Sequence, residues 1–73
     1  MLKVNSPDFS PQEEKVLKEL VKGLTSIEIA KKLNLSPRTI ESYRQNMIRK
    51  TNSKNTIDLV ISAVQQGWLT EGA

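Results

Sequence analysis

The stretch Thr25-Ser-Ile-Glu-Ile-Ala-Lys-Lys-Leu-Asn-Leu-Ser-Pro-Arg-Thr-Ile40 contains two helix starts that lie close together. The first is a capping box from Thr25 to Glu28, and the second is Ser36 followed by proline, which is favoured at the first helical position. Only three residues, beginning with Asn34, separate the two predicted helices, and asparagine adopts positive φ more readily than most residues. A generic αα-hairpin shares some of these features. The complete set at this spacing favours the sharp corner of a helix-turn-helix.

Two further helices are predicted on either side of this stretch. Ser10-Pro11-Gln12-Glu13 is another capping box with proline, and apolar residues recur behind it at helical spacing as far as Gly23. Asn55 is a candidate cap for a last helix that ends at Gly67. No segment alternates between apolar and polar residues as a strand does. The sequence therefore predicts an all-α domain of four helices over residues 9–73, preceded by a tail or linker remnant at residues 1–8.

Length and composition exclude several classes of function. The chain has 73 residues with no cysteine and no histidine, which rules out disulfides, a Cys/His zinc site and a Cys- or His-based catalytic pair. We expect most acidic residues at helix starts or on exposed faces, so an enzyme, a metal site and a cofactor are all disfavoured. The longest apolar run, Leu59-Val60-Ile61, is far shorter than the ~20 residues that span a bilayer. We expect a soluble, cytoplasmic domain with no membrane partner.

Positive charge is concentrated in and just after the third predicted helix. The whole chain has 11 Lys+Arg against 8 Asp+Glu, a net charge of +3. Residues 37–54 carry three arginines and two lysines against Glu41 alone, a net +4. The arginine fork suits phosphate groups and guanine edges, which suggests a polyanionic partner. On charge alone, a solvated helix face explains the cluster equally well.

The third predicted helix, from Pro37 to about Lys50, has an apolar and a polar face. With Ile40, Tyr43 and Met47 turned inward, the outward residues are Arg38, Glu41, Ser42, Gln45 and Arg49, with Arg44 at their border. Arginine suits guanine, glutamine suits adenine, serine suits either, and glutamate accepts from cytosine N4. For Glu41, an ion pair with Arg38 or Arg44 is an equally good interpretation.

Polar residues at the helix starts suit phosphate groups. Thr39, and Thr25 or Ser26 at the preceding cap, lie where backbone N–H groups point out of a helix. The same side chains would cap the helices of any helical protein, so capping alone is the alternative interpretation.

The apolar residues of the last predicted helix cover roughly half of its circumference, wider than the ~100° that one buried face requires. Leu59, Val60 and Ala63 can serve the core, which leaves Ile57, Ile61 and Val64 for a second surface. A broad core contact is one interpretation. An isologous dimer contact is favoured, because two-fold dimers are the commonest oligomers and match palindromic operators. Trp68 is expected to cover the end of the core.

Three segments carry a specific resemblance. They are Phe9-Ser-Pro-Gln-Glu-Glu-Lys-Val-Leu17, Gly23-Leu-Thr-Ser-Ile-Glu-Ile-Ala30 and Leu35-Ser-Pro-Arg-Thr-Ile-Glu-Ser-Tyr-Arg-Gln-Asn-Met-Ile-Arg-Lys50. Over residues 9–69 the chain resembles the LuxR-type DNA-binding domain, the tetrahelical helix-turn-helix at the C-terminus of NarL/FixJ-class response regulators. The resemblance implies transcriptional regulation, a third helix that reads double-stranded DNA, a fourth that mediates dimerisation, and an upstream receiver or ligand-binding domain.

The resemblance also implies roles for individual residues. Positions that contact bases in the family fall on Arg38, Glu41, Ser42 and Gln45. Positions that contact the DNA backbone fall on Thr39, Arg44, Arg49, Lys54 and Asn55.

The chain departs from the family pattern at several positions. Glu41 stands where many relatives carry lysine, so their base preference does not transfer. Tyr43 replaces the usual histidine, and Thr51-Asn52-Ser53 replaces the usual Leu-Gly-Val. Ile27 stands where a polar residue is usual. It supports a second hypothesis, a helical protein-interaction module that docks another regulator through Ile27 and the fourth helix.

Overall fold

The computed structural model describes residues 7–69, and these residues form four helices with no strand. The helices are α1 (Pro11–Val21), α2 (Ser26–Leu33), α3 (Pro37–Thr51) and α4 (Thr56–Gln66). None of these four is long and apolar enough to cross a membrane. The predicted all-α fold is confirmed. Most of the predicted tail (residues 1–6) and the last four residues of the predicted domain (70–73) lie outside the described residues.

Every helix begins at a capping side chain. The four caps are Ser10, Thr25, Ser36 and Asn55, and each accepts a hydrogen bond of 2.9–3.1 Å from the backbone N–H three residues on. In α1 and α2, the carboxylates of Glu13 and Glu28 accept a bond from the cap's own N–H and close a capping box. The helix starts predicted from these short motifs are all confirmed.

All four helices also end in the same way. A residue with left-handed backbone ends each helix or follows it closely: Gly23, Asn34, Asn52 and Gly67, with φ between 57° and 95°. The next residue then donates its N–H to the carbonyl five positions earlier, at 2.8–3.2 Å, which is the Schellman pattern. The positive φ predicted for Asn34 is confirmed. Asn52 plays the same part at the end of α3, a role that was not predicted.

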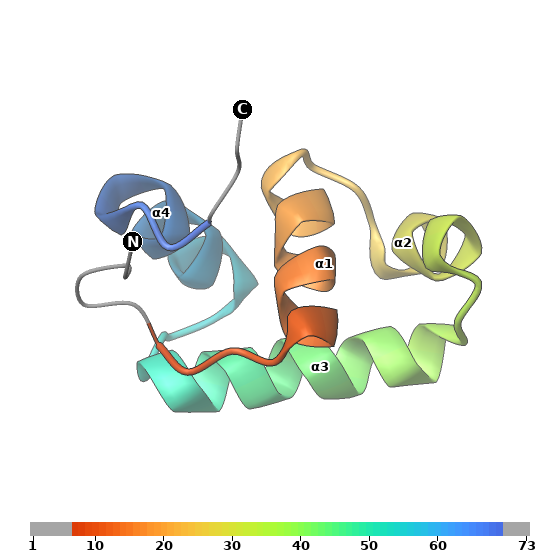
Figure 1. Cartoon of the computed structure of the whole chain (residues 1–73), viewed down its shortest axis with the longest axis horizontal. Helices are drawn as coiled ribbons and strands as arrows, with labels where there is room; N and C mark the ends of the chain where they lie inside the picture. Colours follow the sequence, from red (N-terminus) through yellow and green to blue (C-terminus); the bar gives the residue numbers. More distant parts are fainter. Residues whose placement is uncertain (1–6, 70–73) are drawn as a thin grey trace.

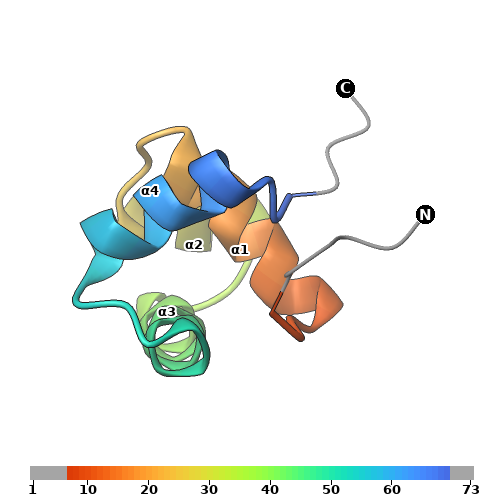
Figure 2. The same cartoon turned by 90° about the vertical axis from the view of Figure 1, so that its left-hand side faces the viewer.

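Helix α3 lies along one side of the molecule, and the other three helices lie on the opposite side. In Figure 1, α1 stands over the middle of α3, with α2 near its N-terminal end and α4 near its C-terminal end. Each of the three packs against α3. Figure 2 looks along α3 and shows α2 and α4 above it, with α1 running from above α3 down to one side of it. The other side of α3 is therefore left uncovered.

The core lies between the four helices. Its buried apolar residues are Val16, Leu17, Leu20, Ile29, Ala30, Ile40, Met47, Leu59, Ala63 and Trp68. In α3, Ile40 and Met47 are completely buried and Tyr43 is partly buried, as predicted for the inward face. Trp68 meets Phe9 edge to face, with the ring centroids 5.9 Å apart. Its burial confirms that it covers one end of the core.

One buried carboxylate belongs to Glu13, which lies in the first turn of α1, a helix start where acidic residues were expected. Its Oε1 accepts from Lys50 Nζ at 2.7 Å, and the same Nζ donates to the carbonyl of Asp8 at 2.9 Å. Burial raises the pKa of Glu13, but the hydrogen bonds from Lys50 and from the N–H of Ser10 outweigh it and lower that pKa. Lys50 at the end of α3 is thereby engaged with the start of the domain.

Glu19 is the second buried carboxylate, and it is an exception to that expectation because it lies neither at a helix start nor on an exposed face. Its Oε1 lies 2.9 Å from Lys32 Nζ and 3.6 Å from Lys22 Nζ. The hydrogen bond from Lys32 lowers the pKa of Glu19, and burial opposes it only in part. In both cases a lysine from another helix reaches the buried carboxylate. Within residues 7–69, no three His, Cys, Asp or Glu side chains gather to hold a metal ion.

Candidate nucleic-acid interface

The uncovered side of α3 carries the polar residues that the helical wheel placed outward. Arg38, Ser42, Gln45 and Arg49 are exposed, and the side chain of Glu41 is 44% exposed. Within residues 7–69, the side chains of Arg38, Ser42 and Gln45 form no hydrogen bond with the protein. Their donors and acceptors are therefore available to a partner.

Glu41 differs from these residues because its carboxylate is held on both oxygens. Ser26 Oγ donates to Oε2 at 2.6 Å, and Arg44 Nη2 donates to Oε1 in an ion pair. The structure thus contains the Glu41–Arg44 ion pair that the sequence offered as an alternative to base contact. Contact between Glu41 and a base stays a prediction.

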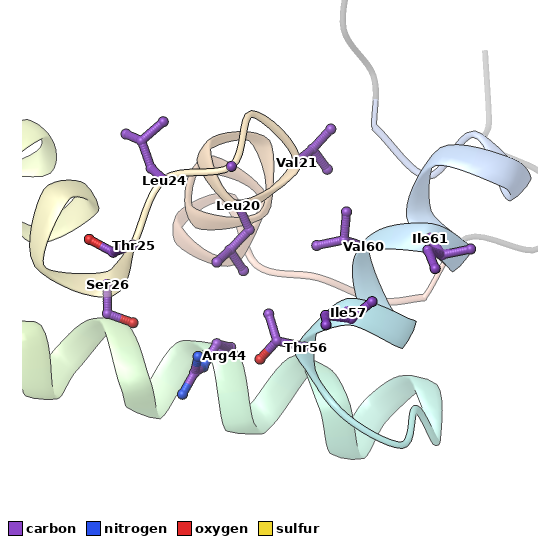
Figure 3. A pocket seen from close by; sticks show the side chains of 11 residues that line it. Leu20, Val21, Leu24, Thr25, Ser26, Arg44, Thr56, Ile57, Val60 and Ile61 are labelled. Atoms are coloured by element: carbon purple, nitrogen blue, oxygen red, sulfur yellow. The ribbon is translucent and has the colours of Figure 1, made fainter.

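Arg44 lies deeper than a border position suggests. Its side chain is 25% exposed, and its Nε is buried with no hydrogen-bond acceptor among the described residues. Together with Ser26, Thr56 and Ile57 it lines a hollow of about 340 Å³ between α1, α3 and α4. Figure 3 shows the Arg44 side chain lying over the ribbon of α3 beneath the start of α2, with the apolar side chains of α4 on the other side of the hollow.

One group of predicted phosphate ligands lies at the starts of α2 and α3. Thr25 Oγ1 accepts from the N–H of Glu28, and Thr39 Oγ1 lies 2.9 Å from Ser36 Oγ. These hydroxyls therefore serve the caps, as the alternative interpretation held. The first N–H groups of each helix have no intrahelical acceptor and point out of its end. Contact with phosphate through these groups stays a prediction.

The second group lies toward the other end of α3. Arg49 is exposed, and its Nη1 donates to Asn46 Oδ1 one turn earlier at 3.1 Å. Lys54 and Asn55 are exposed in the connection to α4, where Asn55 also caps that helix. The two groups of predicted phosphate ligands therefore lie toward opposite ends of the uncovered side of α3.

The outer side of α4 is apolar. Leu59 and Ala63 are buried and Val60 is partly buried, whereas Ile57, Ile61 and Val64 are 71%, 48% and 59% exposed. The predicted division of this helix into a core side and a second apolar side is confirmed. The partner for that second side stays a prediction. Ile27, on α2, is also exposed, by 60%.

Comparisons with known proteins identify the family. Residues 7–63 match the family described as bacterial regulatory proteins, luxR family. The chain is 39% identical over 63 residues to the transcriptional regulatory protein FixJ of Bradyrhizobium diazoefficiens, covering 86% of this chain and 31% of that protein. It is 36% identical over 67 residues to the response regulator UvrY of Escherichia coli, covering 89% and 31%.

A solved structure agrees with these matches. The crystal structure of Escherichia coli SdiA aligns with a TM-score of 0.84 and 31% identity, over 97% of this chain and 29% of that one. The chain thus spans slightly less than a third of the length of each of these relatives. The resemblance inferred from the motifs and the expectation of a non-enzymatic domain are both confirmed. The chain belongs to the LuxR family of bacterial regulatory proteins and is a LuxR-type helix-turn-helix DNA-binding domain.

Proposed function

We propose that this domain binds double-stranded DNA in a sequence-specific manner, with α3 in the major groove. The base-reading residues are Arg38, Glu41, Ser42 and Gln45. The observation that carries the proposal is the uncovered side of α3, on which Arg38, Ser42 and Gln45 are exposed without protein partners among residues 7–69. An α-helix fits the major groove of B-DNA, and side chains of these types discriminate between base edges there.

Groups at both ends of α3 contact the DNA backbone and fix the position of α3 along the duplex. The backbone-contacting residues are Thr25, Ser26, Thr39, Arg44, Arg49, Lys54 and Asn55. Thr25, Ser26 and Thr39 lie at the starts of α2 and α3, where the positive end of the helix dipole favours phosphate. The backbone N–H groups of Thr25 and Thr39 already donate to capping side chains, so of these three residues Ser26 offers its N–H to a phosphate. Arg49 and Lys54 contribute charge, and Arg44 contacts phosphate with the part of its guanidinium that Glu41 does not occupy.

The outer side of α4 mediates dimerisation on DNA through Ile57, Ile61 and Val64. A two-fold dimer would place two copies of α3 on successive half-sites of a palindromic operator. The full protein is a transcription factor with an upstream receiver or ligand-binding domain, and it belongs to a two-component system. This part rests on the short share of each relative that the chain covers and on UvrY, which is named a response regulator.

A titration of the domain with duplex DNA at two salt concentrations tests the proposal. If about four phosphates are neutralised, affinity should fall roughly a hundredfold between 50 and 200 mM salt. Gln45→Ala should change which duplexes bind best, whereas Gln65→Ala on the exposed side of α4 should not. Absence of binding to any duplex at low salt would refute the function, and an unchanged preference in Gln45→Ala would refute the base-reading assignment.

A protein-interaction module remains the second candidate, favoured by the exposure of Ile27 and of the apolar side of α4. It predicts a protein partner that binds without DNA and is lost in Ile27→Ser. The salt titration separates the two candidates, because only binding to a polyanion weakens steeply as salt rises.

A further inference from the structure

The side chains of Ser26, Glu41 and Arg44 form a compact polar group, here named the Glu41 cluster. Ser26 is the first residue of α2, and Glu41 and Arg44 lie one turn apart on α3. The hydroxyl of Ser26 reaches one oxygen of Glu41 at 2.6 Å, and Arg44 reaches the other. Because donors from two different helices hold the two oxygens, the plane of the carboxylate is fixed relative to α3.

The cluster makes a carboxylate tolerable on a surface that faces DNA. An isolated carboxylate would be repelled by phosphates, whereas the guanidinium of Arg44 offsets the charge of Glu41 at contact distance. A carboxylate offers about four lone-pair sites, and Ser26 and Arg44 take one on each oxygen. With 44% of its side chain exposed, Glu41 keeps acceptor capacity that a ligand can reach.

We infer that the Glu41 cluster selects cytosine at one position of the bound sequence, with Ser26 and Arg44 as positioning residues. The inference deepens the proposed function and rests on it. In the major groove, cytosine presents the N4 amino donor and no acceptor. Guanine and thymine present acceptors, and adenine places its N7 acceptor beside its N6 donor. A fixed acceptor with no donor of its own therefore accepts a hydrogen bond from cytosine without opposition. It is repelled by the acceptors of guanine and thymine, and the N7 acceptor beside N6 weakens its bond to adenine.

The first experiment measures base preference directly. Duplexes that bind the domain are selected from a randomised pool, and dissociation constants are then measured for all four base pairs at each position. One position should prefer cytosine by roughly tenfold or more. Glu41→Gln should reduce that preference to about twofold or less, because the amide NH₂ can also donate to the acceptors that other bases present. Preferences at all other positions should persist.

The second experiment tests the positioning residues. Ser26→Ala should lower the cytosine preference several-fold, roughly three- to tenfold, because the hydroxyl that orients the Glu41 carboxylate is lost. Ser26→Thr keeps the hydroxyl and should restore the preference. Ser62→Ala on α4 is the matched control and should change nothing. Arg44→Met should lower the preference and also weaken binding to every duplex.

The outcomes distinguish the inference from the proposed function. A domain that binds no duplex selectively would refute the function itself. Selective binding in which Glu41→Gln leaves every preference intact would overturn the inference and leave the function standing. A cytosine preference that depends on Glu41 but is the same in Ser26→Ala and in the parent would remove the positioning role of Ser26. Thermal unfolding of each variant checks that the fold is retained.

Discussion

The outer sides of α3 and α4 are both open to solvent, but they are built from opposite kinds of residue. The side of α3 carries Arg38, Ser42 and Gln45, and the side of α4 carries Ile57, Ile61 and Val64. Exposed polar side chains form hydrogen bonds with water, so their exposure without a ligand costs no free energy. Exposed isoleucine and valine side chains would each gain about 1.5–3 kcal/mol from full burial.

This difference shows that exposure alone does not identify a functional surface. On α3 the informative feature is which polar side chains remain without a partner among residues 7–69, because Glu41 and Arg44 on the same helix already form an ion pair. On α4 the informative feature is contiguity, since three apolar residues recur on one side of a helix whose other side is already buried. Four predictions sharpen or break the comparison, in order of decreasing effect.

The largest effect is expected when a side chain on the core side of α4 is truncated, and it is compared with the same kind of truncation on the outer side. Leu59→Ala creates a cavity in the core and should lower the free energy of unfolding by about 2–5 kcal/mol. Ile57→Ala removes an exposed side chain and should change it by no more than about 0.5 kcal/mol. Urea unfolding followed by circular dichroism measures both. Equal losses in the two variants would mean that α4 has no distinct outer side.

The next effect comes from Lys50 of α3, whose ammonium group reaches the buried carboxylate of Glu13. Lys50→Met leaves Glu13 buried without its ion pair and should cost about 1–3 kcal/mol at neutral pH. The pKa values of Glu13 and Glu19 are lowered in the fold, so their contribution is complete above the unfolded value near 4.5 and is lost as pH falls below it. The urea midpoint should therefore fall from about pH 5 downward, and less steeply in Lys50→Met.

The control for this prediction is Lys15→Met, which removes an exposed cation of α1. It should leave both the midpoint and its pH dependence close to those of the parent chain. Should Lys15→Met and Lys50→Met behave alike, Lys50 would count among the solvated cations of α3.

A smaller effect is expected at Arg49, which neighbours Lys50 in sequence but donates to the neutral amide of Asn46 where Lys50 pairs with a buried carboxylate. Arg49→Glu should weaken binding to every duplex by roughly tenfold, because a phosphate contact is replaced by repulsion. Lys15→Glu makes the same charge change on α1 and should have a much smaller effect at physiological salt. Fluorescence anisotropy with labelled duplexes measures both. A loss confined to one DNA sequence would assign Arg49 to base reading instead.

The smallest effect on folding is expected from Ile61→Ser on the outer side of α4. The free energy of unfolding should stay within about 0.5 kcal/mol of the parent value. Binding to a duplex with two half-sites should lose its cooperativity, while binding to a single half-site should not change. Gln65→Ser is the matched control. Retained cooperativity in Ile61→Ser would separate α4 from dimerisation.

Helix boundaries and faces could be predicted from the sequence because they depend on residues a few positions apart. The cap at Ser10 needs only the N–H three residues on, and the positive φ at Asn34 needs only a tolerant residue. The outer side of α4 followed from helical spacing once Leu59 and Ala63 were assigned to the core. These interactions are local, so their signals survive in the order of the residues.

The contacts that sequence reasoning missed join distant positions. Ser26 and Glu41 are 15 residues apart, and Glu13 and Lys50 are 37 apart. Glutamates at positions 13 and 19 look solvent-exposed until another helix brings a lysine to each. Which of several cations reaches a carboxylate depends on how the helices pack, and no short pattern encodes that choice.

The edge-to-face pair of Phe9 and Trp68 gives the molecule an optical reporter of its own. The chain contains a single tryptophan, and in the fold its indole is buried against the ring of Phe9. Its emission therefore arises from one place, where the segment before α1 meets the segment after α4. When Phe9 separates from Trp68, the tryptophan emission should shift to longer wavelength, and no added label is needed to observe it. Fluorescence can therefore follow the packing of these two segments, while circular dichroism follows the helices.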